Sequence, residues 1–237
     1  MASPNNLAPA ADENLATHAG WVHLHTPGMR VVDAPDLVLV DSGLPCDTFN
    51  IVCRARLAPE NASERLRTAI DHFAAVGRPF SWWLTPGNQP PDLGARLVAA
   101  GLQCVDSELA MAAELATIPA LNSWPSGLQI RRIHTLAQLH DFAAIIASGW
   151  SPPDGDVLRF YALAAQALLR DDAPLWLYVG YLDQVPVATA ELTVGGGVVG
   201  LYNIVTLEAY RRRGIGTAMT VQPLLDAREQ GHRTAIL

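Results

Sequence analysis

The chain has 237 residues, half of them hydrophobic, which is enough to bury one large core or two smaller ones. Its formal net charge of −7 at pH 7 argues against nucleic acid or an anionic membrane surface as the main partner. All 16 basic residues are arginine, so the chain cannot form a lysine Schiff base or a lysine-containing phosphate loop.

Targeting and metal-binding signals are not evident in the sequence. Residues 1–20 carry neither a basic stretch nor an apolar core, and no apolar run approaches the length of a membrane span. Cys46, Cys53 and Cys104 are too scattered for a disulfide framework or a cysteine-rich zinc site. We therefore predict a cytosolic protein that has reduced cysteines and needs no metal.

Apolar patterns predict strands and helices in alternation. Leu66, Ala69, Ile70 and Phe73 recur at helical spacing, and Gly77 is a natural end for that helix. In the first half we expect strands at 29–34, 36–41, 49–57, 79–84 and 103–115, with helices at 62–76 and 91–101. Residues 117–127 indicate a linker. Beyond it we expect strands at 128–133, 175–182, 185–194, 198–206 and 234–237, and helices at 136–146, at 157–168 and after the glycines that follow residue 206.

The two halves contain an internal repeat. Phe49–Val52 reads FNIV and Tyr202–Val205 reads YNIV, an offset of 203 − 50 = 153. The same offset places Leu84 on Leu237, so strand, loop, helix and strand keep one spacing in both halves. The sequence therefore predicts two copies of one α/β unit, in domains 1–120 and 121–237.

The copies differ in the loop between strand and helix. The second copy reads RRRGIGT at 211–217, where the first reads APENASE at 58–64. A helix start presents unpaired N–H groups and a positive dipole end, and glycines let a phosphate approach the backbone closely. Only the second copy is therefore expected to bind an anion, although a solvated arginine run before a glycine-rich turn would read the same way.

The sequence of this loop distinguishes between two kinds of phosphate-binding motif. A dinucleotide fingerprint needs a third glycine where Met219 stands and an acidic residue about twenty positions on, where the sequence has ended. Arg211, Gly214 and Gly216 instead fit the signature of the GNAT superfamily of acyl-CoA-dependent N-acyltransferases, namely Arg or Gln, two residues, Gly, one residue, Gly or Ala. The stretch NIVTLEAYRRRGIGTA resembles the family's strand and loop, with Glu208 where a proline is frequent. The resemblance spans Leu128–Leu237 in element order.

This resemblance implies an α/β (α+β) fold with mixed sheets flanked by helices, in tandem, with the first copy degenerate. It also implies a V-shaped opening between the strand ending near Thr206 and the strand at 234–237, in which pantetheine of acetyl-CoA lies. Backbone groups of the first strand would pair with pantetheine, and N–H groups of the loop would bind the pyrophosphate. The cofactor-binding residues are then Ile204, Val205, Thr206, Arg211, Arg212, Arg213, Gly214, Ile215, Gly216, Thr217 and Ala218.

Catalytic and acceptor residues are less sharply indicated. Glu191 is the candidate general base, directly or through water, unless it is a surface glutamate on the outer face of its strand. Tyr202 alternates with Asn203, so only one of them should face the substrate. The first copy keeps Asn50 at the equivalent position, which argues against a catalytic Asn203.

The connection between the two helices of the second half, SGWSPPDGD, offers Trp150 and Asp154 as contacts for an amine substrate. Alternatively, Trp150 fills the core. Asp156 would then cap the following helix.

The end of the sequence departs from the family pattern. In the first copy, about thirty residues of helix and strand follow the last repeated strand, whereas the second copy stops there. We expect either a shortened chain or another segment beside the final strand, and the family's usual tyrosine acid cannot be assigned. The predicted function is an acetyl-CoA-dependent N-acetyltransferase acting on a primary amine of a small molecule or peptide, as a monomeric pseudo-dimer or a homodimer. A noncatalytic acyl-CoA-binding or regulatory module and a purely structural tandem domain are the alternatives.

Overall fold

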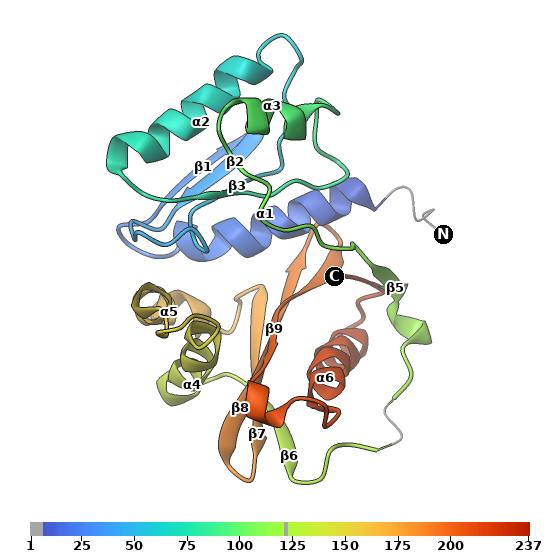
Figure 1. Ribbon diagram of the computed structural model, residues 1–237. Helices are drawn as coiled ribbons and strands as arrows, with labels where there is room; N and C mark the ends of the chain where they lie inside the picture. The colour runs from blue at the N-terminus through green and yellow to red at the C-terminus, as the bar shows by residue number, and fades with distance from the viewer. Residues whose placement is uncertain (1–6, 121–122) are drawn as a thin grey trace. The chain divides into compact units, whose positions relative to one another are not determined.

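The computed structural model describes residues 7–120 and 123–237. The chain divides into two compact units, Met1–Ala110 and Met111–Leu237 (Figure 1). The division precedes the expected linker and the expected boundary at residue 120, because residues 112–114 pair with a strand of the second unit. Two residues of that linker, 121 and 122, lie outside the described residues.

The first unit is a four-stranded sheet with three helices. Its elements are α1 (Ala8–Leu24), β1 (Arg30–Ala34), β2 (Leu37–Asp41), β3 (Ile51–Cys53), α2 (Ala62–Val76), β4 (Ser81–Trp82) and α3 (Leu93–Ala99). The strand order is β1-β2-β3-β4, with β1, β2 and β3 antiparallel and β4 parallel to β3. Helices α2 and α3 bury Leu66, Phe73 and Leu93 against β2 and β3.

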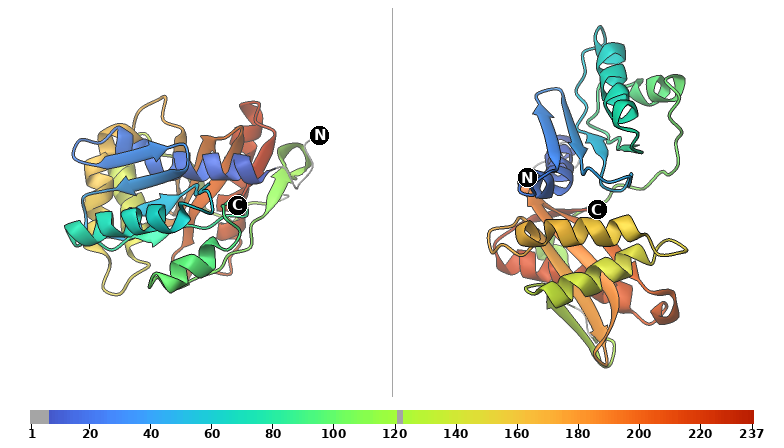
Figure 2. Two further views of the ribbon diagram at one scale, coloured as in Figure 1. Left: turned by 90° about the horizontal axis from the view of Figure 1, so that it is seen from above. Right: turned by 90° about the vertical axis from the view of Figure 1, so that its left-hand side faces the viewer.

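The second unit is a six-stranded sheet between helices. Its elements are β5 (Ala112–Glu114), β6 (Leu128–Arg132), α4 (Leu136–Ala147), α5 (Gly155–Leu168), β7 (Leu175–Leu182), β8 (Val185–Gly195), β9 (Val198–Thr206), α6 (Ile215–Glu229) and β10 (Thr234–Ile236), with short 3₁₀ turns η2 (Leu115–Thr117) and η3 (Glu208–Tyr210). The strand order is β5-β10-β9-β8-β7-β6. Helix α6 covers one face of this sheet, and α4 and α5 cover the other (Figures 1 and 2). The predicted fold class is therefore confirmed.

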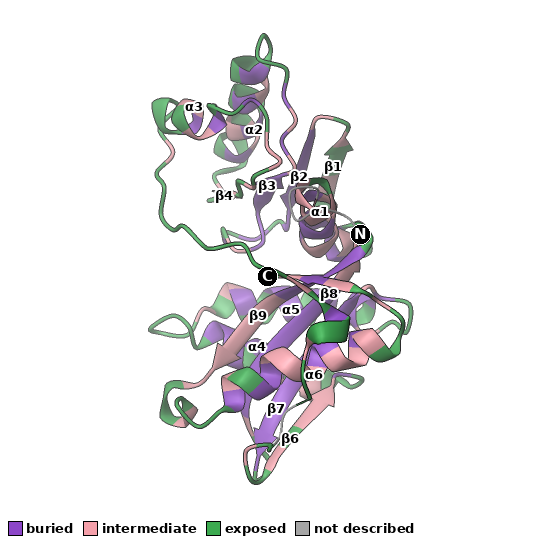
Figure 3. Cartoon of the chain, turned by 90° about the vertical axis from the view of Figure 1, so that its right-hand side faces the viewer, coloured by how far each residue is buried: buried purple, intermediate pink, exposed green. Residues whose placement is uncertain are grey.

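Local signals explain the element ends in the second unit. Thr135 and Gln138 form a reciprocal capping box at the start of α4. Asp183 and Gln184 both have positive φ, which is the two-residue turn that suits the twist of the β7–β8 hairpin. The strands between these helices are buried along most of their length (Figure 3).

The two units share one topology from β3 of the first unit and β9 of the second unit onward. Helices α2 and α6 both contain 15 residues and start at Ala62 and Ile215, which are 153 positions apart. The preceding strands β3 and β9 are each antiparallel to one neighbour and parallel to the strand after the helix. The repeat seen in the sequence therefore corresponds to a repeated arrangement of strands.

Three expected strands are shorter in the structure: the one at 49–57 is limited to β3, the one at 79–84 to β4, and the one at 103–115 to β5. Helix α1 was not predicted. The place beside β10 is taken by β5, antiparallel, with Thr234 opposite Glu114. None of the helices in the described ranges is long and apolar enough to cross a membrane.

Candidate functional site

Strands β9 and β10 pair at the start of β9. Their parallel pairing joins Ala235 to Val199 and Ile236 to Gly200, at the start of β9. Beyond Gly200, β9 runs six residues further to Thr206, and in the part of the chain that the structure describes no β10 residue pairs with that stretch. Residues 201–206 of β9 therefore have no β10 partner among the described residues, and we call them the open stretch of β9; the opening between the two strands stays a prediction.

The equivalent place in the first unit is closed. There β4 pairs with β3 at Ile51 and Val52, and the amide of Trp83 donates to the Val52 carbonyl at 2.9 Å. Ile51 and Val52 correspond to Ile204 and Val205, so β4 pairs with the part of β3 that corresponds to the open stretch of β9. The first copy has no equivalent opening among the described residues.

The N-terminus of α6 lies directly after the open stretch of β9. Gly214 stands before the helix with φ 77°, and no side chain caps the first turn. The first bond into the helix is from the Ala218 amide to the Gly214 carbonyl, at 3.1 Å. The amides of Ile215, Gly216 and Thr217 precede that bond and are the ordinary unpaired donors of a helix start.

Around these amides the loop is positively charged and close to β9. Arg211, Arg212 and Arg213 are all exposed. Arg211 Nε donates to the Thr206 carbonyl at 3.0 Å, and Arg213 lies over the Tyr210 ring. A Cβ at Gly216 would lie 3.6 Å from Thr206 Oγ1, so the helix start and the end of β9 are neighbours. This arrangement fits an anion attached to an extended chain.

The predicted cofactor residues thus lie close together, but they differ in which of their groups, backbone or side chain, a ligand could reach. The side chains of Ile215 and Ala218 are buried and Ile204 packs against the core cluster, so these residues can offer only backbone groups. Gly214, Gly216 and the arginines remain accessible at least in part. The assignment of this set to a cofactor stays a prediction.

Glu191 lies on the sheet face opposite α6, in a polar row on β8. Its carboxylate accepts hydrogen bonds from Thr193 Oγ1 and from Asn203 Nδ2, both at 2.9 Å. Glu191 is 2% exposed and has Tyr202 as its cross-strand partner on β9. It is therefore not a surface glutamate, which removes one of the two readings of this residue.

Asn203 breaks the alternation of β9. Its φ is 52°, and the β8–β9 register shifts between Thr189 and Glu191. Because of this bulge, strict alternation does not hold here: Tyr202 is the cross-strand partner of Glu191, and the next residue, Asn203, also bonds to Glu191. Which of the two faces a substrate stays a prediction. Thr189 and Thr193 were not among the predicted site residues, although polar residues at every second position of a buried strand are a signal that marks them.

The acceptor candidates lie between α4 and α5. Trp150 is 44% exposed, so it does not fill the core. Asp154, rather than Asp156, caps α5, because its carboxylate accepts from the amides of Asp156 and Val157. These two bonds give Asp154 a structural role as a helix cap. A contact of Asp154 or Trp150 with an acceptor stays a prediction.

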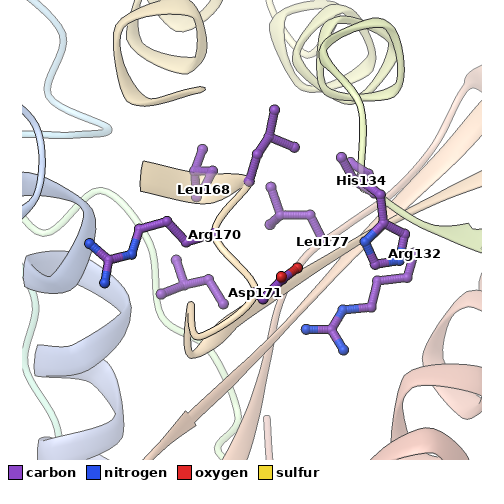
Figure 4. A pocket seen from close by; sticks show the side chains of 9 residues that line it. Arg132, His134, Leu168, Arg170, Asp171 and Leu177 are labelled. Atoms are coloured by element: carbon purple, nitrogen blue, oxygen red, sulfur yellow. The ribbon is translucent and has the colours of Figure 1, made fainter. Parts of the chain in front are cut away.

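A small pocket lies elsewhere on the second unit. It has a volume of about 100 Å³ and is lined where β6 and α5 end and β7 begins, with Arg132, His134, Arg170 and Asp171 around it (Figure 4). None of the predicted site residues lines it. Among the described residues no group of three or more His, Cys, Asp or Glu side chains could hold a metal ion.

Comparisons with known proteins bear on the family and the fold. The acetyltransferase (GNAT) family model matches residues 135–237, whereas no curated protein sequence gives a significant match. A GCN5-related N-acetyltransferase from Kribbella flavida is similar in structure, with a TM-score of 0.69, 23% identity and coverage of 95% of this chain and 84% of that one. A functionally unknown conserved protein from Staphylococcus epidermidis gives a TM-score of 0.55 and 13% identity over 87% of this chain and 81% of that one.

At these identities the two solved structures bear on the fold alone, and both likenesses extend over the two units. The family model bears on the second unit, where it begins at Thr135, the residue that caps α4. The GNAT resemblance of the sequence is confirmed: residues 135–237 form an acetyltransferase domain of the GNAT family, within a chain of GNAT-like fold.

Proposed function

We propose that the chain is an N-acetyltransferase that moves the acetyl group of acetyl-CoA to a primary amine of a small molecule or peptide. The family of residues 135–237 supports acyl transfer from coenzyme A in general. The finer statement, acetyl as the acyl group and an amine as the acceptor, is our inference.

One observation carries the proposal. In the second unit, a backbone edge without a β10 partner lies next to an uncapped helix start, and the described residues of the first unit contain no equivalent arrangement. The open stretch of β9 ends at Thr206, and the uncapped amides of α6 begin at Ile215. A pantetheine arm can pair with such an edge while its pyrophosphate meets the amides. Arg211 donates a hydrogen bond to the Thr206 carbonyl. Pantetheine would therefore pair with backbone groups of β9 that precede this carbonyl.

Acyl transfer from a thioester needs a neutral amine, stabilisation of the oxyanion and protonation of the leaving thiolate. Glu191 is the proposed proton acceptor for the amine, directly or through water, because its carboxylate is ionisable, buried and next to the bulge of β9. Tyr202 is proposed to line the same face as its cross-strand partner. The amine nitrogen forms the new bond to the acyl carbon, the carbon–sulfur bond breaks, and free thiol is released.

Two measurements test the proposal in sequence. Titration calorimetry with acetyl-CoA measures binding, and thiol release across a panel of primary amines then measures transfer. Binding followed by amine-dependent thiol release supports the proposal. Binding without turnover on any amine favours the alternative, a noncatalytic acyl-CoA-binding or regulatory module, and absence of binding leaves a purely structural tandem domain.

The remaining parts of the proposal rest on the sequence. The first copy is proposed to be a degenerate domain that binds no acyl-CoA, since its strands are paired where the opening would be. A cytosolic location, a monomeric pseudo-dimer or homodimer, and the lack of a nucleic-acid or membrane partner stay predictions.

A further inference from the structure

Asn203 has an unusual backbone conformation, and both its side chain and its main chain form hydrogen bonds to β8. With φ 52° it lies in the left-handed region, which asparagine tolerates better than most residues. Its Nδ2 donates to Glu191 Oε2, and its own carbonyl accepts from Thr189 Oγ1, both at 2.9 Å. Two β8 side chains, two positions apart, therefore fix one residue of β9.

The carboxylate of Glu191 is held at both oxygens. Thr193 Oγ1 donates to Oε1 while Asn203 donates to Oε2. One donor bonds to each oxygen of this carboxylate, so these two bonds fix its orientation. Thr189 and Thr193 are 0% exposed, so this polar row is part of the packed structure of β8.

The equivalent asparagine of the first copy has different partners. Asn50 accepts from the amide and hydroxyl of Ser42 and donates to the carbonyls of Leu44 and Pro79. No carboxylate takes part in that set, and Asn50 is fully buried. Asn50 and Asn203 therefore have different hydrogen-bond partners although they occupy equivalent positions. The presence of Asn50 in the first copy is thus no argument against a functional role for Asn203.

We propose that Asn203 is a positioning residue, which aims the carboxylate of Glu191 at the reacting amine. The inference rests on the proposed function, in which Glu191 accepts the proton of the amine. Asn203 itself touches neither proton nor thioester and acts through Glu191. General bases contribute on the order of 10²- to 10⁴-fold to rate, and misaligning one loses part of that.

The test is a double-mutant cycle between the two residues. Asn203→Gly removes the amide donor but keeps a residue that accepts positive φ, so the bulge is retained. Asn203→Asp also tolerates this backbone and removes the donor, and it serves as the second variant if the glycine variant does not fold. Each is made alone and with Glu191→Gln, and kcat and KM are measured with the amine of the panel that reacts fastest, beside the Kd for acetyl-CoA from calorimetry.

The expected result is a loss of kcat of about tenfold or more in Asn203→Gly, with the Kd for acetyl-CoA within about twofold of the unmodified chain. In the Glu191→Gln background the same change should lower kcat by less than about threefold, because the residue it acts through is already lost.

A full additional loss in that background, an unchanged kcat in the single variant, or a tenfold weaker Kd for acetyl-CoA would each overturn the inference. Absence of acetyl-CoA binding or of turnover in the unmodified chain would instead overturn the proposed function beneath it.

Discussion

Substitution of Gly216 by leucine tests the anion site most directly. Gly216 is the second residue of α6, and a Cβ there would meet Thr206 Oγ1 at 3.6 Å, an ordinary contact that the fold tolerates. The rest of a leucine side chain would extend over the junction of β9 and α6, where a pyrophosphate has to approach the amides. Leucine also favours a helix over glycine by up to about 1 kcal/mol, so α6 itself should not be weakened.

The expected magnitude follows from the contacts that would be lost. A hydrogen bond to a charged group contributes about 1.5 to 3 kcal/mol, and keeping the pyrophosphate away would remove about two of them. A loss of about 3 to 6 kcal/mol corresponds to a Kd for acetyl-CoA that is about 100- to 20,000-fold weaker. Titration calorimetry measures this Kd, and thermal unfolding checks that the variant remains folded.

The first copy provides a matched control. Ser63 is the second residue of α2, is exposed, and corresponds to Gly216 at the 153-residue offset. Ser63→Leu should leave the Kd for acetyl-CoA unchanged. The reasoning is refuted if Gly216→Leu binds as tightly as the unmodified chain, or if both substitutions weaken binding equally.

Three further outcomes are expected. Calorimetry should give one acetyl-CoA per chain, because β3 and β4 are paired where the second opening would be, and a stoichiometry of two would contradict this. Burial lowers the pKa of His23 to about 4, below its unfolded value of about 6.5. The folded chain therefore favours neutral His23, and its free energy of unfolding should be highest above pH 6.5. It should fall by about 3 kcal/mol as the pH drops to 4, because the unfolded chain then binds a proton that folded His23 resists. Urea unfolding at several pH values should show this loss in the unmodified chain and not in His23→Gln, and equal pH dependence of the two would exclude it. Tyr178→Phe removes a 2.9 Å hydrogen bond from β7 to Asp226 on α6 and should lower the free energy of unfolding by about 1 to 2 kcal/mol; identical urea midpoints would show that this bond contributes nothing.

Elements with a strong local signal could be predicted from the sequence. Helix α2 and strands β7 and β9 have the predicted bounds, Ala62–Val76, Leu175–Leu182 and Val198–Thr206. In α2 one apolar stripe faces the core and Gly77 ends the helix with φ 63°. The two strands are apolar runs bounded by turn residues, which is the pattern of a strand between two covering layers.

Elements that depend on tertiary context could not be predicted. Helix α1 buries Asp12 and Asn14 together with Leu15, so its buried face does not form an apolar stripe. Strand β5 is only three residues long, and it exists because β10, more than a hundred residues later, offers a free edge. Neither feature leaves a periodic pattern in the local sequence.

The candidate site divides in the same way. Gly214 and Gly216 could be recognised because backbone geometry demands small residues at set spacings. The partners of Glu191 could not, since they depend on a bulge at Asn203 that shifts the register of β9 by one position. A strand read by strict alternation assigns Tyr202 and Asn203 to opposite faces, and the left-handed backbone of Asn203 removes that rule.

The strand β5 decides where the second unit can be excised as an independent protein. A cut at residue 120 would separate β10 from its outer neighbour and would discard Leu115, which is 0% exposed in the core beneath α6. The unpaired backbone groups at the exposed edge of β10 could then bond to strands of other chains, which favours aggregation. A recombinant fragment intended to work alone should therefore begin at Met111 or earlier, although the family match starts only at residue 135.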